Sequence, residues 1–155
     1  MAIEIERKFL VNGEGWRSSV TASTLLQQGY LPGLVTASVR VRIAGDRAFL
    51  NIKSATLGTT RTEFEYAIPV PDAHDLLESL CEQPRIEKTR HNVPFGGHLW
   101  QVDEFFGDNA GLVVAEIELA SVNESFAVPP WIGREVSSDT RYYNVNLVKK
   151  PYKSW

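Results

Sequence analysis

The sequence predicts a mainly β protein: an eight-stranded antiparallel barrel that closes into a tunnel and carries a few flanking helices. Apolar and polar residues alternate with a period of two in several short segments, as in half-buried strands. Gly, Pro, Asn or Asp stands between many of these segments, which favours short antiparallel connections. The charged alternates come in same-sign pairs, and an enclosed interior is a place where charges from other strands can balance them.

The composition fits one domain spanning residues 1–155. Hydrophobic residues make up 43% of the chain and charged residues 23%, which argues against a disordered or fibrous protein. A net charge of −3 gives no basic field that would gather nucleic acid, and the single cysteine excludes an internal disulfide. The apolar runs are too short to span a bilayer, and the first residues lack the order of a signal peptide. We therefore expect a cytoplasmic protein without membrane or nucleic-acid partners.

Eight segments account for the barrel. Five alternate clearly, at residues 3–10, 37–43, 48–53, 61–68 and 113–119. Three follow the pattern less closely, at residues 24–31, 85–93 and 99–106. In residues 85–93 polar side chains occupy both parities, so the pattern alone does not choose an inner face there.

Helices are few and short. Asp72 is expected to cap a helix whose apolar face is formed by Ala73, Leu76, Leu77 and Leu80. A short helix is expected around Trp16 and Val20. A last helix is expected to start at Ser138 or Asp139 and to continue through Leu147.

The same-sign pairs decide which face of each strand points inward. Charges that alternate along one strand normally face water, and a purely solubilising surface mixes the two signs. Here like charges recur two residues apart, where they share a face, in the pairs Glu4/Glu6, Arg40/Arg42, Glu63/Glu65, Lys88/Arg90 and Glu116/Glu118. A barrel that turns these faces inward suits a complex of polyphosphate and metal, since carboxylates bind Mg²⁺ or Mn²⁺ and Arg and Lys bind phosphate oxygens.

An ordered set of motifs carries a family resemblance over the whole chain. Glu4-Ile5-Glu6-Arg7-Lys8 matches a Glu-x-Glu-x-Lys signature, and further matches follow in order at residues 28–31, 39–42, 52–54, 61–65, 85–90, 102–103, 115–118 and 141–144. The chain in this respect resembles the CYTH, or triphosphate tunnel metalloenzyme, family. Its compact length makes it most similar to the short bacterial inorganic triphosphatases.

The resemblance implies a role for each matched position. It implies metal-binding carboxylates at Glu4, Glu6, Asp103, Glu116 and Glu118. It implies phosphate-binding side chains at Lys8, Arg40, Arg42, Lys53, Lys88 and Arg90. It implies catalytic roles for Lys8 and Tyr30, and we expect supporting roles for Arg61, Glu63, Glu65 and Arg141. The implied cofactor is Mg²⁺ or Mn²⁺, as two ions.

The expected reaction is hydrolysis of the terminal phosphoanhydride of inorganic triphosphate to pyrophosphate and phosphate. The alternatives are a class IV-type adenylate cyclase, a thiamine or nucleoside triphosphatase, and a module that binds polyphosphate without cleaving it. A cyclase is disfavoured because only three residues precede Glu4, where the His-Phe element of that branch would stand. An outer apolar face that three short helices do not fully cover makes a homodimer a further expectation.

Overall fold

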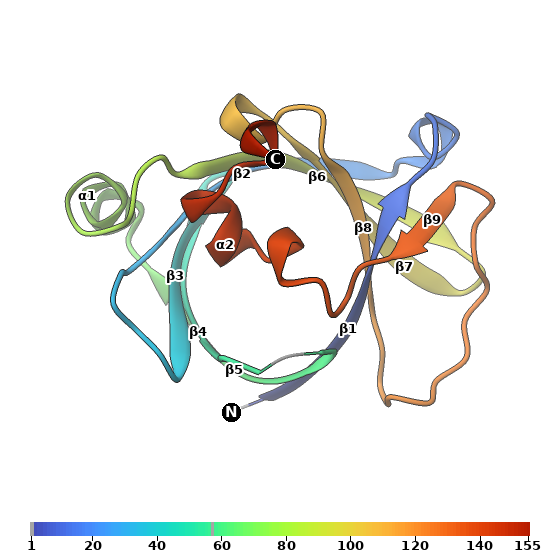
Figure 1. Cartoon of the computed structure of the whole chain (residues 1–155), viewed down its shortest axis with the longest axis horizontal. Helices are drawn as coiled ribbons and strands as arrows, with labels where there is room; N and C mark the ends of the chain where they lie inside the picture. The colour runs from blue at the N-terminus through green and yellow to red at the C-terminus, as the bar shows by residue number, and fades with distance from the viewer. Residues whose placement is uncertain (1, 57) are drawn as a thin grey trace.

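Nine antiparallel strands form one continuous sheet that closes on itself in the computed structural model, which describes residues 2–56 and 58–155 (Figure 1). The strand order is β5-β4-β3-β2-β6-β7-β8-β1-β9, and a further pairing of β5 with β1 closes the first eight strands into a barrel. The strands are β1 (Ala2–Val11), β2 (Ala22–Tyr30), β3 (Ala37–Ala44), β4 (Arg47–Ser54), β5 (Thr60–Ile68), β6 (Ile86–Phe95), β7 (His98–Phe105), β8 (Val113–Glu118) and β9 (Ile132–Glu135).

The predicted eight-stranded barrel is confirmed, and one strand was not predicted. Each predicted segment coincides with one of the strands β1 to β8 to within about two residues at either end. The additional strand β9 pairs with the end of β1, where Phe9 faces Glu135 and Val11 faces Ile132. It has only four residues, Ile-Gly-Arg-Glu, which are too few to show an alternation.

The helices begin at other residues than the sequence suggests. Helix α1 (Val70–Ser79) starts after Pro69, so Asp72 lies in its first turn and the prediction of Asp72 as the cap was wrong. Proline suits such a start, because the first backbone N–H groups of a helix have no partner within it. The expected last helix is divided: η3 (Thr140–Tyr142) and α2 (Asn144–Lys149) flank the extended Tyr143.

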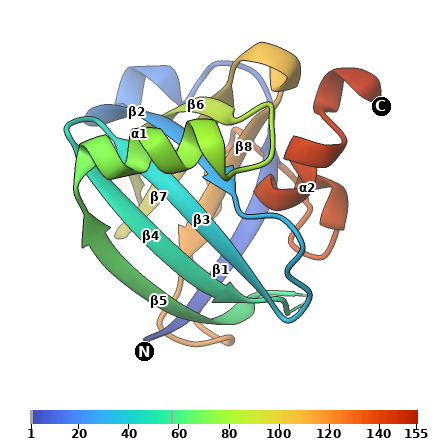
Figure 2. The same cartoon turned by 90° about the vertical axis from the view of Figure 1, so that its left-hand side faces the viewer.

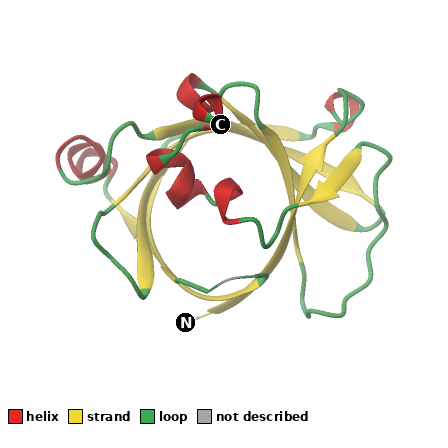
Figure 3. Ribbon diagram, in the orientation of Figure 1, coloured by secondary structure: helices red, strands yellow, loops and turns green. Residues whose placement is uncertain are grey.

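Most of the apolar core lies outside the barrel wall, between the strands and the segments that cover them. Helix α1 covers β3 and β4 through a cluster that includes Val41, Ile43, Ala48 and Leu77. A second cluster surrounds Trp100 on β7 and is covered by Trp16, just before η1 (Arg17–Ser19), and by Trp131. Figure 3 shows most helical segments around the ring of strands, and the segment from η3 to α2 within it.

The C-terminal segment lies against the bore and packs on the barrel through a third cluster. Leu147 and Val148 of α2 are buried in this cluster together with Ile86 of β6 and Tyr30 of β2. Figure 2 shows α2 and the C-terminus on the same side of the barrel. The smaller elements η2 (Gly107–Asn109) and η4 (Tyr152–Ser154) lie near each other, and the backbone N–H of Tyr152 donates to Asn109 Oδ1. One end of the bore is therefore bordered by residues of the last 20 positions.

Part of the outer surface of β1 and β5 carries no cover. Ile3 is 64% exposed and Tyr66 57% exposed, with Phe64 also exposed between them on the same face. The expected homodimer is not tested by this surface and stays a prediction. In the described part of the chain, every helix falls short of the length and apolarity that a membrane crossing requires.

Candidate active site

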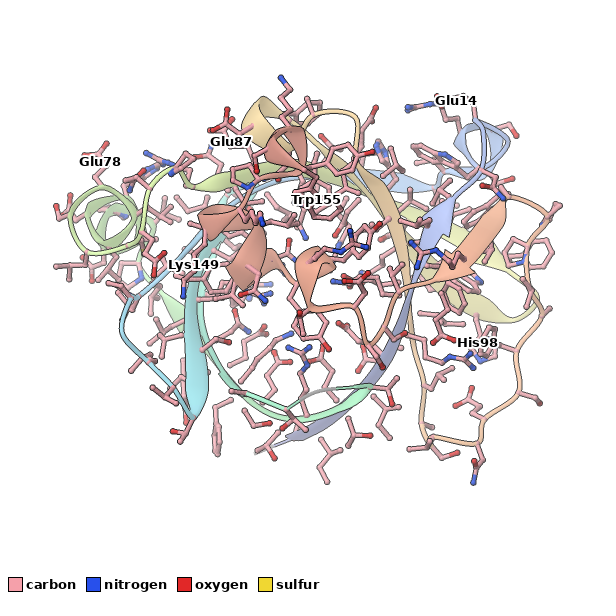
Figure 4. The ribbon with its side chains drawn as sticks, in the orientation of Figure 1. Glu14, Glu78, Glu87, His98, Lys149 and Trp155 are labelled. Carbon is pink, nitrogen blue, oxygen red and sulfur yellow. The ribbon has the colours of Figure 1, made fainter. Side chains whose placement is uncertain are left out.

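The bore of the barrel contains a polar cavity of about 400 Å³. Alternate residues of the strands supply its wall, and the C-terminal segment adds Tyr143, Asn144 and Val145. Figure 4 shows many nitrogen and oxygen atoms within the ring of strands, whereas the labelled side chains of Glu14, Glu78 and His98 lie outside it. The inward orientation of the charged alternates, on which the sequence argument depends, is confirmed.

One wall of the cavity is acidic. Glu4 and Glu6 of β1 lie beside Glu116 and Glu118 of β8, since Glu6 is paired in register with Glu118. Burial, together with the nearby charges of Glu116 and Glu4, raises the pKa of Glu6 to about 7. Burial and the charges of Glu4 and Glu6 raise the pKa of Glu118 as well. The carboxylates on this wall therefore repel one another and favour a bound cation.

Two lysines partly compensate the acidic wall. Lys53 Nζ lies 2.9 Å from Glu4 Oε2 and 3.6 Å from Glu63 Oε2. Lys8 Nζ lies 3.6 Å from Glu116 Oε1 and donates to the carbonyl of Tyr142 at 3.1 Å. Both ammonium groups remain on the cavity wall, where a phosphate oxygen can reach them.

The opposite wall is basic. Arg40 and Arg42 of β3 lie four strands from β8 in either direction around the barrel. Within residues 2–56 and 58–155, no carboxylate lies within salt-bridge distance of either guanidinium. Burial, with the charges of Arg40 and Arg90, lowers the pKa of Arg42 to about 9. A buried cation, Arg40, and a partly buried one, Arg42, both without a carboxylate partner, form a site suited to an anion.

A buried ionic network lies between these two walls. Asp103 on β7 accepts from Lys88 Nζ at 2.6 Å and from Arg90 Nε and Nη2, each at 2.8 Å. Arg90 Nη2 also donates to Glu116 Oε2 at 3.1 Å. Although burial alone would raise it, Arg90 and Lys88 hold the pKa of Asp103 well below its usual range. The network fixes the two cations of β6 and shows that Lys88 and Arg90 face inward, which the mixed sequence pattern left open.

The two predicted catalytic residues line the same cavity from opposite strands. Lys8 on β1 and Tyr30 on β2 are four strands apart around the barrel. In the described chain no hydrogen bond joins them: Lys8 bonds the Tyr142 carbonyl, and the Tyr30 hydroxyl accepts from Gln28 Nε2 at 3.0 Å. Lys8 and Tyr30 therefore line one cavity from opposite sides without contacting each other.

All but two of the predicted site residues line the cavity, among the residues described. Asp103 lies behind the wall with no exposed surface, and both of its oxygens are taken by cations. Arg141 lies at the surface, where it pairs with Asp139 Oδ2 at 2.7 Å and stacks on Trp155. The environment of Asp103 differs from the one expected of a metal ligand, and that assignment stays a prediction.

Several neutral polar residues of the site were not predicted. Asn51 donates to Glu63 and Glu65, Gln28 contacts Arg42 and Tyr30, and Asn144 accepts from Lys88 Nζ at 3.1 Å. Asn51 shares the parity of Lys53, and Gln28 shares that of Tyr30, so strand parity alone was a usable signal. The predicted site depended mainly on charged residues and therefore lacked the uncharged residues on the same inner face.

The donor set fits a hard divalent cation. In the described chain no three carboxylate, imidazole or thiolate groups are close enough to form a ready-made metal cage. Nevertheless Glu4, Glu6, Glu116 and Glu118 line one wall, where burial and neighbouring carboxylates raise the pKa of Glu6 and that of Glu118. Oxygen donors are the ligands that Mg²⁺ and Mn²⁺ prefer. A divalent ion would relieve the carboxylate repulsion that adds to burial in raising the pKa of Glu6.

Fold and site together define a class of protein: a closed antiparallel barrel whose bore carries facing acidic and basic walls. Comparison with known proteins identifies the family. The CYTH domain model matches residues 2–152, and the chain belongs to the CYTH family.

Two similar proteins are both named inorganic triphosphatase. One, from Acetivibrio thermocellus, is 50% identical over 155 residues, which is all of this chain and 99% of that protein. The other, from Nitrosomonas europaea, is 36% identical over 148 residues, 93% of this chain and 95% of its own. The crystal structure of the inorganic triphosphatase NE1496 aligns with a TM-score of 0.66 at 35% identity, covering 96% of this chain and 95% of that one.

Proposed function

We propose that this chain is an inorganic triphosphatase that hydrolyses tripolyphosphate to pyrophosphate and phosphate, with Mg²⁺ or Mn²⁺ as cofactor. One observation carries the proposal: acidic side chains of β1 and β8 face basic side chains of β3 across a single enclosed cavity. A linear polyanion with bound divalent ions presents both charges at once, so it matches both walls. The two relatives named inorganic triphosphatase, each at more than 30% identity, support the same substrate.

The acidic wall is where the metal would be held. Glu4, Glu6, Glu116 and Glu118 are the carboxylates on the cavity surface beside which a divalent ion can bind. When bound, Mg²⁺ or Mn²⁺ supplies Lewis-acid chemistry, neutralising phosphate oxygens and making water a stronger nucleophile. Two ions are proposed because the family resemblance implies two.

The basic residues bind and orient the substrate. Arg40 and Arg42 offer guanidinium donors without a carboxylate partner in the described chain, so phosphate oxygens can occupy them. Lys88 and Arg90 add positive charge from the neighbouring side of the bore. As the terminal phosphoanhydride breaks, these cations stabilise the charge that develops on its oxygens.

Lys8 and Tyr30 flank the remaining space and would orient the attacking water. The water oxygen forms a bond to the terminal phosphorus, and the bond from that phosphorus to the bridging oxygen breaks. Its electron pair leaves with pyrophosphate, and the net reaction releases pyrophosphate, phosphate and a proton. Of the two, Lys8 is the stronger candidate for orienting the attacking water, because its ammonium lies on the cavity wall beside Glu116, one of the proposed metal-binding carboxylates.

Release of phosphate from tripolyphosphate, ATP and thiamine triphosphate, each with Mg²⁺ or Mn²⁺, tests the proposal. We expect tripolyphosphate to have the highest kcat/KM and Lys8→Met to lower kcat at least 100-fold. Lys149→Met, on the exposed end of α2, is the matched control and should retain activity. Cyclic AMP from ATP would identify a cyclase, and tight tripolyphosphate binding without phosphate release under either metal would identify a binding module.

A further inference from the structure

Gln28 is a fully buried glutamine behind the cavity wall, and it contacts two of the residues that line the cavity. Its Oε1 accepts from Arg42 Nε at 2.9 Å and from Arg42 Nη2 at 2.7 Å. Its Nε2 donates to the hydroxyl of Tyr30 at 3.0 Å. The strand register places Gln28 directly opposite Arg42, and Tyr30 directly opposite Arg40. One amide thus joins a predicted phosphate ligand to a predicted catalytic residue.

The chemistry of the guanidinium determines the orientation of this amide. Arg42 has only hydrogen-bond donors, so the oxygen of Gln28 must face it and the amide nitrogen must face Tyr30. Tyr30 therefore accepts a hydrogen bond from the protein at its hydroxyl oxygen, and its own hydroxyl proton is left to donate elsewhere. Because Tyr30 lines the cavity, the free direction is toward a phosphate oxygen or a water there.

The neutral charge of Gln28 matters as much as its geometry. Arg90, the comparable guanidinium on β6, is held by the carboxylates of Asp103 and Glu116. Arg42 is instead held by an amide, which fixes the side chain with two hydrogen bonds and cancels none of its charge. A buried cation without a counter-charge costs free energy unless an anion binds to it. Because no carboxylate of the protein neutralises Arg42, its guanidinium is left to bind the anionic substrate.

We propose that Gln28 is a positioning residue that aims Arg42 and Tyr30 at the bound triphosphate while keeping the charge of Arg42 available to it. The proposal rests on the proposed function and gives a role to a residue that lies in a matched motif, residues 28–31, but to which the family resemblance assigns none. Gln28 is not among the described residues that line the cavity, so it acts through its two partners, Arg42 and Tyr30.

The decisive variant is Gln28→Glu, which has nearly the same shape. It keeps an oxygen acceptor for Arg42, adds a negative charge beside it, and removes the donor to Tyr30. We expect KM for tripolyphosphate to rise at least tenfold, and the dissociation constant to rise equally in calorimetric titration. The matched control is Gln27→Glu, the same substitution one position earlier on the opposite face of β2, where the side chain meets Arg85. Its KM should stay within twofold of the unsubstituted protein.

A second variant separates charge from orientation and guards against misfolding of the first. Gln28→Met is similar in length and removes both hydrogen bonds without adding charge, so we expect a smaller rise in KM, about three- to tenfold. If Gln28 only filled space, its substitution would lower the thermal midpoint and the active fraction of the protein and would leave KM unchanged. A KM within twofold of the unsubstituted protein in Gln28→Glu, or in Gln28→Met if the first variant does not fold, overturns the proposal.

The binding measurement distinguishes this proposal from the proposed function. If the unsubstituted protein hydrolyses tripolyphosphate and the Gln28 variants keep its KM, the function stands and the role of Gln28 fails. If the unsubstituted protein binds tripolyphosphate without hydrolysing it, and Gln28→Glu weakens that binding tenfold, the role of Gln28 stands and the function fails. A protein that binds neither tripolyphosphate nor pyrophosphate overturns both.

Discussion

Arg90 holds Asp103 in a two-point ion pair behind the cavity wall, with Nε 2.8 Å from Oδ1 and Nη2 2.8 Å from Oδ2. Lys88 Nζ lies 2.6 Å from Oδ2 of the same carboxylate. Asp103 therefore pairs with two cations that border the cavity, of which Arg90 is partly exposed and Lys88 fully buried. Removing one member of such a buried group leaves uncompensated charge, which typically costs several kcal/mol.

Asp103→Asn separates this role from that of a metal ligand. We expect the variant to lose about 3 kcal/mol or more in free energy of unfolding. We expect kcat/KM for tripolyphosphate to fall at least tenfold, because Lys88 and Arg90 lose their anchor. The Mn²⁺ affinity of the metal-free protein, measured by calorimetry, should change less than threefold. Asp108→Asn, at an exposed position, is the control; a tenfold loss of Mn²⁺ affinity in Asp103→Asn would instead support the predicted ligand role.

Lys53→Met should affect metal and substrate in opposite directions. Lys53 Nζ lies 2.9 Å from Glu4 Oε2, so its charge competes with a divalent ion for the acidic wall. Without it, we expect Mn²⁺ to bind about tenfold more tightly in the absence of substrate. KM for tripolyphosphate should rise, since a phosphate ligand is lost. Titration of Mn²⁺ into the metal-free protein measures the first effect, and weaker Mn²⁺ binding would contradict the proposed competition.

The stability of the metal-free protein should fall as pH rises from about 5 to about 7. The folded state raises the pKa of Glu6 to about 7, and the unfolded chain has a pKa of 4.5 at this residue. A raised carboxyl pKa means that the folded state binds the proton more tightly, so ionisation above pH 4.5 removes stability until the folded pKa is passed. Burial lowers the pKa of Lys88 to about 7, so the ionisation of Lys88 changes the stability only above this pH range.

Thermal midpoints measured from pH 5 to pH 7 in a chelating buffer test this expectation. The midpoint should decline in the unsubstituted protein and decline less in Glu6→Gln, which cannot ionise. Added Mn²⁺ should raise the midpoint most at the upper end of the range, where the acidic wall is fully charged. An equal decline in Glu6→Gln would assign the pH dependence to other groups.

The sequence predicted the barrel because strand alternation is local and the charges mark the inner face of most strands. The inner face of residues 85–93 could not be predicted in this way. The bonds from Lys88 and Arg90 to Asp103 on the partner strand β7 show that these two side chains face inward. Tyr143 is another case: its extended backbone divides the last helical segment, and its hydroxyl donates to the Ser137 carbonyl across a short loop. Such tertiary contacts have no period in the sequence.

The positions of the neutral site residues could be predicted only in part. Parity places Gln28 on the inner face of β2, but its role depends on its neighbour across the strand pair, Arg42. Strand β9 depends on its partner in the same way: a Cβ at Gly133 would lie 3.1 Å from the Leu10 carbonyl oxygen and from Asn12 Oδ1, and no alternation in the sequence shows this close approach. A sequence pattern identifies charged residues because their charge suggests a role without knowledge of their partners. It does not identify residues such as Gln28, whose role depends on a neighbouring strand.

Gly29→Ala should destabilise the protein and disturb the strand that carries Gln28 and Tyr30. Gly29 faces outward between these two residues, where α1 ends against β2. A Cβ at this position would lie 2.9 Å from Cys81 Cβ and 3.0 Å from Leu77 Cδ2, and a Cβ atom of the neighbouring backbone cannot swing away as a long side chain can. The helix end must move, so we expect a loss of about 1–3 kcal/mol in free energy of unfolding, measured by urea denaturation.

Gly15→Ala is the matched control for this substitution. A Cβ there meets no atom within 4 Å and the backbone φ is not in the left-handed region, so we expect a change within about 0.5 kcal/mol. The catalytic readout extends the test: if α1 holds β2 in register for the site, KM for tripolyphosphate should rise in Gly29→Ala at temperatures well below its unfolding midpoint. A stable variant with unchanged KM would mean that the contact between α1 and Gly29 can relax without moving Gln28 or Tyr30.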